Sequence, residues 1–276
     1  MSFEVSAVPY VDFAAGDEGV RVECMDALQL GRVRALWAPA LSLPCPAIAT
    51  HLLIDDQQRL WVDGACVSRP CDHPCPLAEL QQELVVRRLG QRPEVLVLHA
   101  ALLVYQGRAV LLVGHSGAGK STMTRQFVQA GASYVTDDCV IVKAQTSYGM
   151  ARSIHFDPLL TTDQVPPYLA GCDLTSFHIP WPHRVEVVPL WPHYGEVLPS
   201  VSVPNLPWTV VALRRGEVDH VASLGATDRL CHLHGAVVTT GVEYQGEFGF
   251  DATYELTWHD PAQAFDLLTR NWDAIS

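Results

Sequence analysis

The sequence predicts an α/β fold in which a mixed sheet follows a small β-rich N-terminal part. Two apolar runs, 95–105 and 109–113, have the character of neighbouring strands joined by a short polar turn. The second run leads through a glycine-rich turn into a segment with helical spacing at 120–129. Residues 1–75 instead contain short apolar or alternating segments separated by turn residues.

The composition is that of a well-packed globular chain. Of its 276 residues, 49% are hydrophobic and 17% are charged, which excludes a disordered chain. The net charge of −12 and the lack of a basic run argue against nucleic acid or an anionic membrane as the main partner. An anionic nucleotide would have to be attracted by a local site, because the overall field repels it.

The sequence also predicts a cytoplasmic location. The first residues, Met1 to Val5, lack the basic and apolar stretches of a signal peptide. The longest apolar run, Val95 to Tyr105, is shorter than the roughly 20 residues that a membrane-spanning helix needs. We therefore expect neither secretion nor a membrane partner.

A proline-rich segment divides the chain into two predicted domains. Segments such as Val20–Cys24 and His51–Ile54 predict strands in the first part, and Asp55-Asp56 predicts a hairpin turn before the next strand. Three prolines then fall between Ser68 and Pro76, which is typical of a linker. We expect a β-rich N-terminal region at 1–75 and a catalytic domain at 76–276.

The second domain is predicted to contain both element types. The first strand pair should be antiparallel because Gln106-Gly107-Arg108 resembles a hairpin turn. Gly131 should end the helix that begins at Lys120, and Leu230, Leu233 and Val237 should face inward from a later helix. The expected helices are 76–88, 120–129, 227–238 and one opened by Asp260-Pro261, and the expected strands are 95–105, 109–113, 133–143, 185–188 and 209–213.

The glycine-rich turn has the complete Gly-x-x-x-x-Gly-Lys-Ser pattern of a phosphate-binding loop. Its glycines let backbone N–H groups turn toward phosphate oxygens at the positive end of the following helix. Lys120 would contact the β- and γ-phosphates, and the hydroxyl of Ser121 would ligate Mg²⁺. We therefore expect ATP and Mg²⁺ to bind at Gly114, His115, Ser116, Gly117, Ala118, Gly119, Lys120, Ser121 and Thr122.

An acidic pair, Asp137-Asp138, interrupts the apolar run that follows this helix. Two carboxylates in such a run are costly unless a cation neutralises them, and Mg²⁺ beside the nucleotide would do so. Neighbouring strand residues point to opposite faces, so one carboxylate would bind metal while the other accepts a proton from an attacking hydroxyl.

His99 and the cysteine-rich segment leave alternatives open. His99, on the strand before the loop, is either a core histidine or part of the site. Cys66, Cys71, His73 and Cys75 offer four soft ligands to zinc within ten residues, but their spacing fits no standard finger, so reduced loop thiols are the alternative.

Taken together, His99-Ala100, Gly107, the loop 114–121, Gly131 and Asp137-Asp138 resemble the catalytic core of HPr kinase/phosphorylase and its related bacterial proteins. The resemblance covers residues 95–145 and implies the mixed-sheet phosphate-loop core shared with phosphoenolpyruvate carboxykinase. It implies transfer of the γ-phosphate of ATP to a hydroxyl, typically of serine. It also implies that the protein tends to form homo-oligomers.

The resemblance assigns catalytic roles to individual residues. It implies that one carboxylate of the acidic pair binds metal while the other is the base, and that His99 lies near the phosphates. We assign the metal to Asp137 and the base to Asp138, with the reverse order as the alternative. The family's Arg-Gly-x-Gly signature after the acidic pair is absent, and Arg152 at a comparable place would stabilise charge on the transferred group. Without that signature, we expect neither phosphorolysis nor HPr itself as substrate.

Three functions remain in competition. The first is a kinase acting on Ser or Thr of a peptide or protein, including a biosynthetic precursor peptide, or on a free amino acid or other small hydroxyl compound. The aromatic and His-rich stretch 177–194 would then be an acceptor surface, or else packing of an irregular region. The second is a nucleotide-binding regulatory protein without transfer chemistry. The third is a carboxykinase-like lyase, which would need a specific set of cationic residues around an oxaloacetate. The chain is short for such an enzyme and has only 18 Lys and Arg residues, so we disfavour this function.

Overall fold

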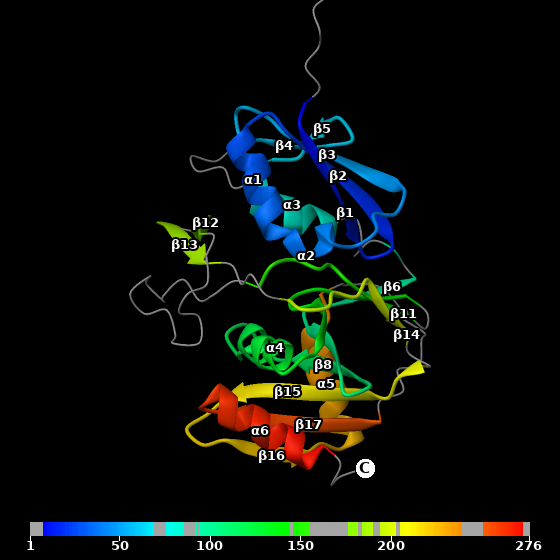
Figure 1. Cartoon of the computed structure of the whole chain (residues 1–276), viewed down its shortest axis with the longest axis vertical. Helices are drawn as coiled ribbons and strands as arrows, with labels where there is room; N and C mark the ends of the chain where they lie inside the picture. The colour runs from blue at the N-terminus through cyan, green and yellow to red at the C-terminus, as the bar shows by residue number, and fades with distance from the viewer. Residues whose placement is uncertain are drawn as a thin grey trace, which may run out of the picture.

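The computed structural model describes residues 8–68, 76–85, 92, 94–143, 146–154, 176–181, 184–189, 194–202, 205–238 and 251–272. Three sheets are stacked along the long axis of the molecule, with the N-terminal sheet at one end (Figure 1). Each of the two larger sheets contains both parallel and antiparallel pairs, so the chain has a mixed α/β fold.

The N-terminal sheet has the order β1-β2-β3-β4-β5. Its strands are β1 (Tyr10–Ala15), β2 (Glu18–Cys24), β3 (Ile48–Ile54), β4 (Leu60–Val62) and β5 (Ala65–Cys66). β2 and β3 are parallel, and the hairpin predicted at Asp55-Asp56 joins β3 to β4. We refer to these strands with the two helices between β2 and β3 as the N-terminal unit.

Those two helices, α1 (Ala27–Leu36) and α2 (Ala38–Leu41), were not predicted from the sequence. Asp26 caps α1, because its side chain accepts a hydrogen bond from the N–H of Leu28. Leu30, Val33 and Leu36 are buried from one face of α1. The apolar positions are not confined to one face, since Leu28 is 62% exposed, and Gly31 interrupts the helix, so the periodicity was too weak to indicate it.

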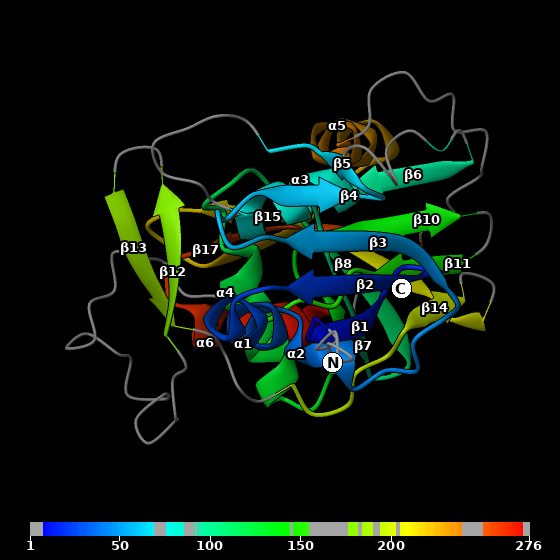
Figure 2. The ribbon, with the colours of Figure 1, turned by 90° about the horizontal axis from the view of Figure 1, so that it is seen from above.

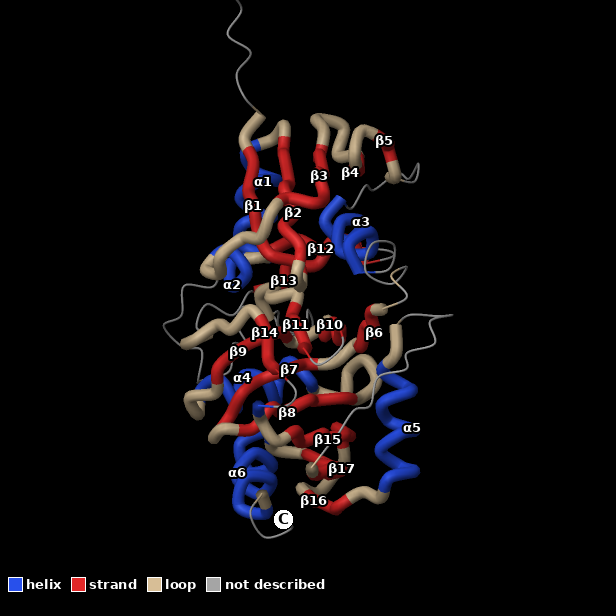
Figure 3. The backbone as a smooth tube through the Cα atoms, turned by 90° about the vertical axis from the view of Figure 1, so that its right-hand side faces the viewer, coloured by secondary structure: helices blue, strands red, loops and turns tan. Residues whose placement is uncertain are grey.

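Helix α3 (Pro76–Gln82) begins at the proline that the sequence indicated, and residues 86–88 of the predicted helix 76–88 lie outside the described part of the chain. Its apolar face agrees with the prediction, since Leu77 and Leu80, and Leu84 just beyond it, are buried. Figure 3 shows α3 between the N-terminal sheet and strand β6. The helix therefore faces both the N-terminal unit and the rest of the molecule.

The middle sheet is antiparallel, with the order β14-β11-β10-β6. Its strands are β6 (Val95–Leu98), β10 (Val140–Lys143), β11 (Thr146–Gly149) and β14 (Ser200–Ser202). A separate antiparallel hairpin, β12 (Ser176–Trp181) with β13 (Arg184–Pro189), lies at the side of the stack (Figure 2).

The third sheet has the order β16-β17-β15-β8-β7-β9. Its strands are β7 (Ala101–Tyr105), β8 (Arg108–Val113), β9 (Ser133–Thr136), β15 (Trp208–Arg215), β16 (His220–Ser223) and β17 (Ala252–Trp258). β8, β15 and β17 run parallel, and β7 pairs antiparallel with β8 through the predicted hairpin. Helices α4 (Lys120–Gln129) and α6 (Pro261–Asn271) cover one face, and α5 (Ala226–Ala236) lies on the other (Figure 3).

Two segments that were predicted as single strands are each divided between two sheets. Residues 95–105 form β6 in the middle sheet and β7 in the third, with the break at His99-Ala100. Residues 133–143 form β9 and β10 in the same way, with the break at 137–139. In both cases the chain crosses between two stacked sheets, which apolar runs by themselves do not reveal.

The predictions for the two C-terminal helices had different outcomes. Asp260 caps α6 and Pro261 opens it, as predicted. Helix α5 instead begins at Ala226, and the inward face predicted for it is confirmed only at Leu233, which packs partly buried against the core, whereas Leu230 is 65% exposed and Val237 37% exposed. No helix in the described part of the chain is both long and apolar enough to cross a bilayer.

Candidate active site

The glycine-rich loop 114–121 joins β8 at the centre of the third sheet to the first turn of α4. Gly117 and Gly119 have φ of 80° and 98°, which favour glycine. A Cβ at Gly119 would lie 2.0 Å from Cζ2 of Trp258, so the loop also has no room for a side chain there. The backbone thus turns tightly ahead of the α4 N-terminus, where helical N–H groups lack intrahelical partners.

Trp258, at the end of β17, packs against the loop. Its indole Nε1–H donates to the carbonyl of Ala118 at 2.7 Å, and the ring is buried. The guanidinium of Arg215 lies over the same ring, 4.7 Å from its centroid. The sequence analysis did not identify either residue, since no motif connects them to the loop.

Lys120 folds back over the loop. Its Nζ donates to the carbonyl of Gly114 at 2.8 Å and lies 3.4 Å from the carbonyl of His115. Burial lowers the pKa of this lysine, although the nearby carboxylates of Asp138 and Asp137 oppose the shift. The ammonium group is therefore held inside the loop.

Asp137 faces the first turn of α4. The hydroxyl of Ser121 donates to Oδ2 of Asp137 at 2.8 Å, and the hydroxyl of Tyr134 lies 3.4 Å from Oδ1. Burial raises the pKa of Asp137 to about 6, against the influence of nearby Arg152. A buried carboxylate beside a helix-terminal hydroxyl is a pair of oxygen ligands that suits Mg²⁺.

Asp138 faces a different set of partners. Its Oδ2 accepts from Nε2 of Gln81 at 2.7 Å and lies 3.3 Å from a guanidinium nitrogen of Arg152. Its Oδ1 lies 3.2 Å from Nδ1 of His99. Because both carboxylates lie in a bend, the expectation of opposite strand faces is wrong, but they do have separate partners.

Arg152 is buried beneath this pair. Its NH1 donates to Oε1 of Gln81 at 2.7 Å, and its own carbonyl accepts from the hydroxyl of Tyr134 at 2.7 Å. Burial tends to lower the pKa of this arginine, but the Asp138 and Asp137 carboxylates outweigh burial and raise it. A guanidinium with two carboxylates nearby remains charged.

The structure thus brings most of the predicted site residues together. Ser121 meets Asp137, while His99 and Arg152 meet Asp138 rather than the loop. Two predicted loop residues pair locally: Nδ1–H of His115 donates to the carbonyl of Ser116, and Thr122 accepts from Arg125 of the next turn.

Gln81 is another site residue that the sequence analysis missed. It lies within the predicted helix 76–88, 57 positions before Asp138 in the chain. The one feature of the sequence that could have indicated Gln81 is its position next to the apolar Leu80. Polar residues beside apolar ones are too common in helices to indicate a site.

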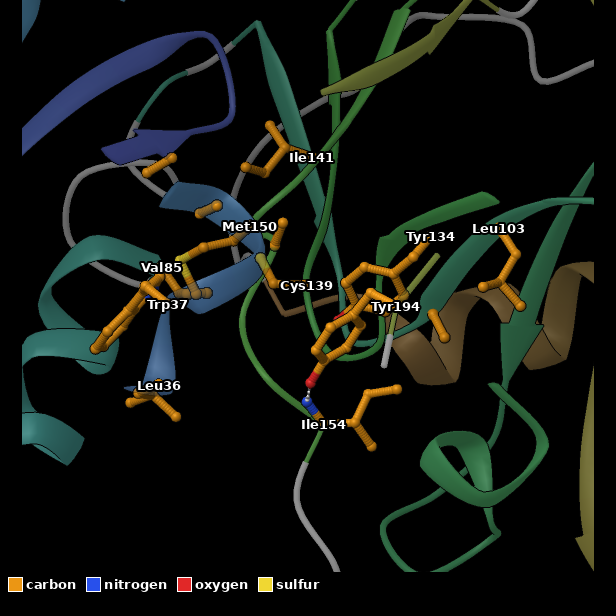
Figure 4. Close-up of a cluster of buried hydrophobic side chains, with 14 of the residues drawn as sticks. Leu36, Trp37, Val85, Leu103, Tyr134, Cys139, Ile141, Met150, Ile154 and Tyr194 are labelled. Atoms are coloured by element: carbon orange, nitrogen blue, oxygen red, sulfur yellow. Dashed lines mark hydrogen bonds between the residues drawn. The ribbon is translucent and has the colours of Figure 1, made fainter. Parts of the chain in front are cut away.

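An apolar cluster lies behind the acidic pair. Figure 4 shows Trp37 and Leu36 near Val85 and Met150, with Cys139 beside them. The hydroxyl of Tyr194 accepts from the N–H of Ile154 at 2.7 Å in the same cluster. Side chains from the N-terminal unit therefore form part of the core beneath the site.

The two segments with open alternatives, the cysteine-rich segment and the stretch 177–194, lie partly outside the described residues. Of the four soft ligands, only Cys66 is described, and it is exposed, whereas Cys71, His73 and Cys75 are not. Among the described residues, no group of three or more His, Cys, Asp or Glu could hold a metal ion. Within 177–194, residues 177–181 and 184–189 belong to the antiparallel strands β12 and β13.

Comparisons with known proteins give two findings. A family model described as the SynChlorMet cassette protein ScmC matches residues 73–155, which contain the loop, the acidic pair and Arg152. The structure of the HPr(Ser) kinase/phosphatase from Coxiella burnetii matches 64% of this chain and 96% of that chain, at 14% identity and a TM-score of 0.32. No curated protein matches the chain.

Proposed function

We propose that the protein is an ATP-dependent kinase that transfers the γ-phosphate to a hydroxyl group, with Ser or Thr of a peptide or protein as the acceptor. The observation that carries the proposal is the 2.8 Å hydrogen bond between Ser121 and Asp137 at the start of α4. It joins the last residue of the phosphate-binding motif to the acidic pair, which lies 16 positions further along the chain.

The residues present fit Mg-ATP. Lys120 and the first N–H groups of α4 would hold the β- and γ-phosphates. Ser121 and Asp137 provide the hydroxyl and carboxylate oxygens that suit Mg²⁺, which would neutralise charge on the polyphosphate when bound. A Cβ at Gly114 would lie 2.9 Å from the Ala118 Cβ, so the loop depends on a close backbone approach.

Asp138 is assigned the role of base. Its carboxylate would take the proton from the acceptor hydroxyl as that oxygen attacks the γ-phosphorus and the bond to the β-phosphate oxygen breaks. The negative partners of Arg152 keep the guanidinium charged, so it would balance the charge of Asp138 and of the transferred group. His99 would orient the second carboxylate oxygen.

One observation favours a nucleotide-binding regulatory protein as the second candidate. Both oxygens of Asp138 already contact side chains of this protein, namely Gln81, Arg152 and His99. An acceptor hydroxyl would therefore have to share the carboxylate with these groups. A protein that binds ATP only as an effector would need no such sharing.

The test is incubation of the protein with γ-labelled ATP and a cell extract from its source, followed by mass spectrometry of labelled species. A labelled peptide or protein supports the proposal. A labelled free amino acid or other small hydroxyl compound would show that the protein is a kinase with a small-molecule acceptor. Binding of ATP without any labelled product would favour the regulatory function.

Lys120→Ala is the matched negative variant for this assay, and we expect it to abolish nucleotide binding. The only other lysine, Lys143, pairs with Asp17 away from the loop at 2.7 Å, so Lys143→Ala is the control. Titration with a fluorescent ATP analogue measures both. Equal binding by Lys120→Ala and wild type would contradict the assignment of the loop.

A further inference from the structure

The N-terminal unit reaches the candidate site through α3. The hydroxyl of Ser68, just after β5, donates to the carboxylate of Glu79 on this helix. Leu77 and Leu80 of α3 belong to the same hydrophobic cluster as Phe13 and Trp37 of the N-terminal unit. α3 is thus fixed to the N-terminal unit by both polar and apolar contacts.

Gln81, also on α3, contacts the acidic pair. Its carboxamide bridges two charged groups, donating to Asp138 at 2.7 Å and accepting from Arg152 at 2.7 Å. A carboxylate only accepts and a guanidinium only donates, so this orientation of the amide satisfies both partners whereas the flipped one satisfies neither. A carboxamide is suited to this bridge because it carries one donor end and one acceptor end.

The N-terminal unit also holds the backbone around Arg152. The N–H of Ala40 donates to the carbonyl of Ala151 at 3.0 Å. Ser153 donates to α1 twice, through its N–H to the carbonyl of Leu36 at 2.6 Å and through its hydroxyl to the carbonyl of Ala35 at 2.7 Å. Both neighbours of Arg152 are therefore tied to helices α1 and α2.

We propose that the N-terminal unit completes the transfer site, with Gln81 as a positioning residue that aligns the carboxylate of Asp138 and the guanidinium of Arg152. This inference rests on the proposed function, and it assigns the β-rich N-terminal part a role in phosphate transfer. Residues 151–153, anchored on α1 and α2, fix one end of the arrangement, and Gln81 on α3 fixes the other.

The test compares Gln81→Met with Gln82→Met. Methionine keeps the length of the side chain and removes both hydrogen bonds, while Gln82, the next residue of the same helix, is exposed. The probe is phosphate release from γ-labelled Mg-ATP with water as acceptor, beside direct binding of Mg-ATP. We expect unchanged ATP binding in both variants and a turnover lowered about 10- to 100-fold in Gln81→Met alone, since small misplacements of reacting groups have effects of that size.

A double-variant cycle separates positioning from a general effect on folding. If Gln81 acts through Asp138, adding Gln81→Met to Asp138→Asn should change turnover by less than about twofold. The same fold loss in both backgrounds, or wild-type turnover in Gln81→Met, would overturn the proposal. Ser153→Ala, which removes the hydroxyl bond to the carbonyl of Ala35 on α1, should lower turnover in the same direction without loss of ATP binding.

Melting temperatures test the Gln81 bridge independently of the proposed function. If the wild-type protein neither binds nor turns over Mg-ATP, the proposed function is contradicted. The contact between Gln81 and Asp138 is then tested by the melting temperatures of the variants. Non-additive shifts for Gln81→Met and Asp138→Asn would support the bridge, and additive shifts would overturn it.

Discussion

The loop side of the candidate site, proposed to bind phosphate and called the phosphate side below, is one continuous stretch of chain. The side around Asp138, proposed to face the acceptor and called the acceptor side, is assembled from distant segments. Loop 114–121 and α4 follow one another directly, and only Asp137 and Trp258 are added to them. Gln81, His99, Asp138 and Arg152, by contrast, come from four places in the sequence.

This difference determines what each side depends on. The loop is shaped mainly by its own glycines and by the strand and helix that it joins, and Trp258 packs against it from β17. The acceptor side exists only while the N-terminal unit, α3 and the bend at 137–139 are packed together. Substitutions on the two sides should therefore have separable effects, with binding affected on one side and transfer on the other.

The largest difference between the effects on transfer and on ATP binding is expected for Asp138→Asn. The amide is nearly the same shape as the carboxylate but accepts a proton poorly, so transfer should fall by about 10²–10⁴-fold, as expected for loss of a general base. ATP binding should stay close to that of the wild type, because the loop is intact. Single-turnover transfer from γ-labelled ATP and nucleotide titration measure the two quantities.

The control for this variant is Asp56→Asn, an exposed change in the N-terminal hairpin. Wild-type transfer by Asp138→Asn would show that this carboxylate is not the base. Loss of ATP binding in the same variant would show that the two sides are not separable.

A smaller effect, confined to the phosphate side, is expected for Gly119→Ala compared with Gly117→Ala. Both residues have positive φ, which disfavours alanine by about 1–2 kcal/mol. Only at Gly119 would the added Cβ also meet Trp258, at 2.0 Å, whereas no atom lies within 4 Å at Gly117. We expect Gly119→Ala to lower the free energy of unfolding by about 3 kcal/mol or more.

Chemical unfolding of the two alanine variants, together with ATP titration, checks this difference. Gly119→Ala should also lose ATP affinity, because the ring must move away from Ala118 to make room. Equal stability of the two variants would contradict the close packing of Trp258 against the loop.

The smallest expected effect is a pH dependence at Asp137. Burial raises the pKa of this carboxyl from its ordinary 3.8 to about 6 in the folded protein. The stabilisation from its protonated form is fully present below about pH 4 and is lost as the pH rises through about 6. In metal-free protein, Asp137→Asn should therefore gain stability relative to wild type between pH 4 and pH 7, by roughly 2–3 kcal/mol at most.

Urea unfolding of both proteins at several pH values between 4 and 7 measures this relative gain. The exposed variant Asp56→Asn again serves as the control. A difference between Asp137→Asn and wild type that stays constant with pH would mean that this carboxyl is not held in a buried environment.

Local features of the fold were predictable because they depend on neighbouring residues. Helix α4 has the predicted bounds, Gly131 follows it with a φ of 92°, and Asp260-Pro261 opens α6. The hairpin between β7 and β8 also follows from its own turn. In each case, the residues that determine the element lie within it or next to it.

Features that require distant partners were not predictable in the same way. The breaks at His99-Ala100 and at 137–139 exist because the chain passes between two sheets, and neither His99 nor the acidic pair by itself indicates such a crossing. The exposed Leu230 of α5 shows the same limit, since helical spacing indicates a face but not whether anything covers it.

By itself, the sequence determined the composition of the loop, its place between a strand and a helix, and the nearby acidic pair. Only the tertiary structure decided that Asp137 faces Ser121 while Asp138 faces Arg152 and Gln81. The physical reason is that a turn and a helix start are fixed by backbone conformation over a few residues. A side-chain contact between segments 57 positions apart depends instead on how whole sheets and helices pack.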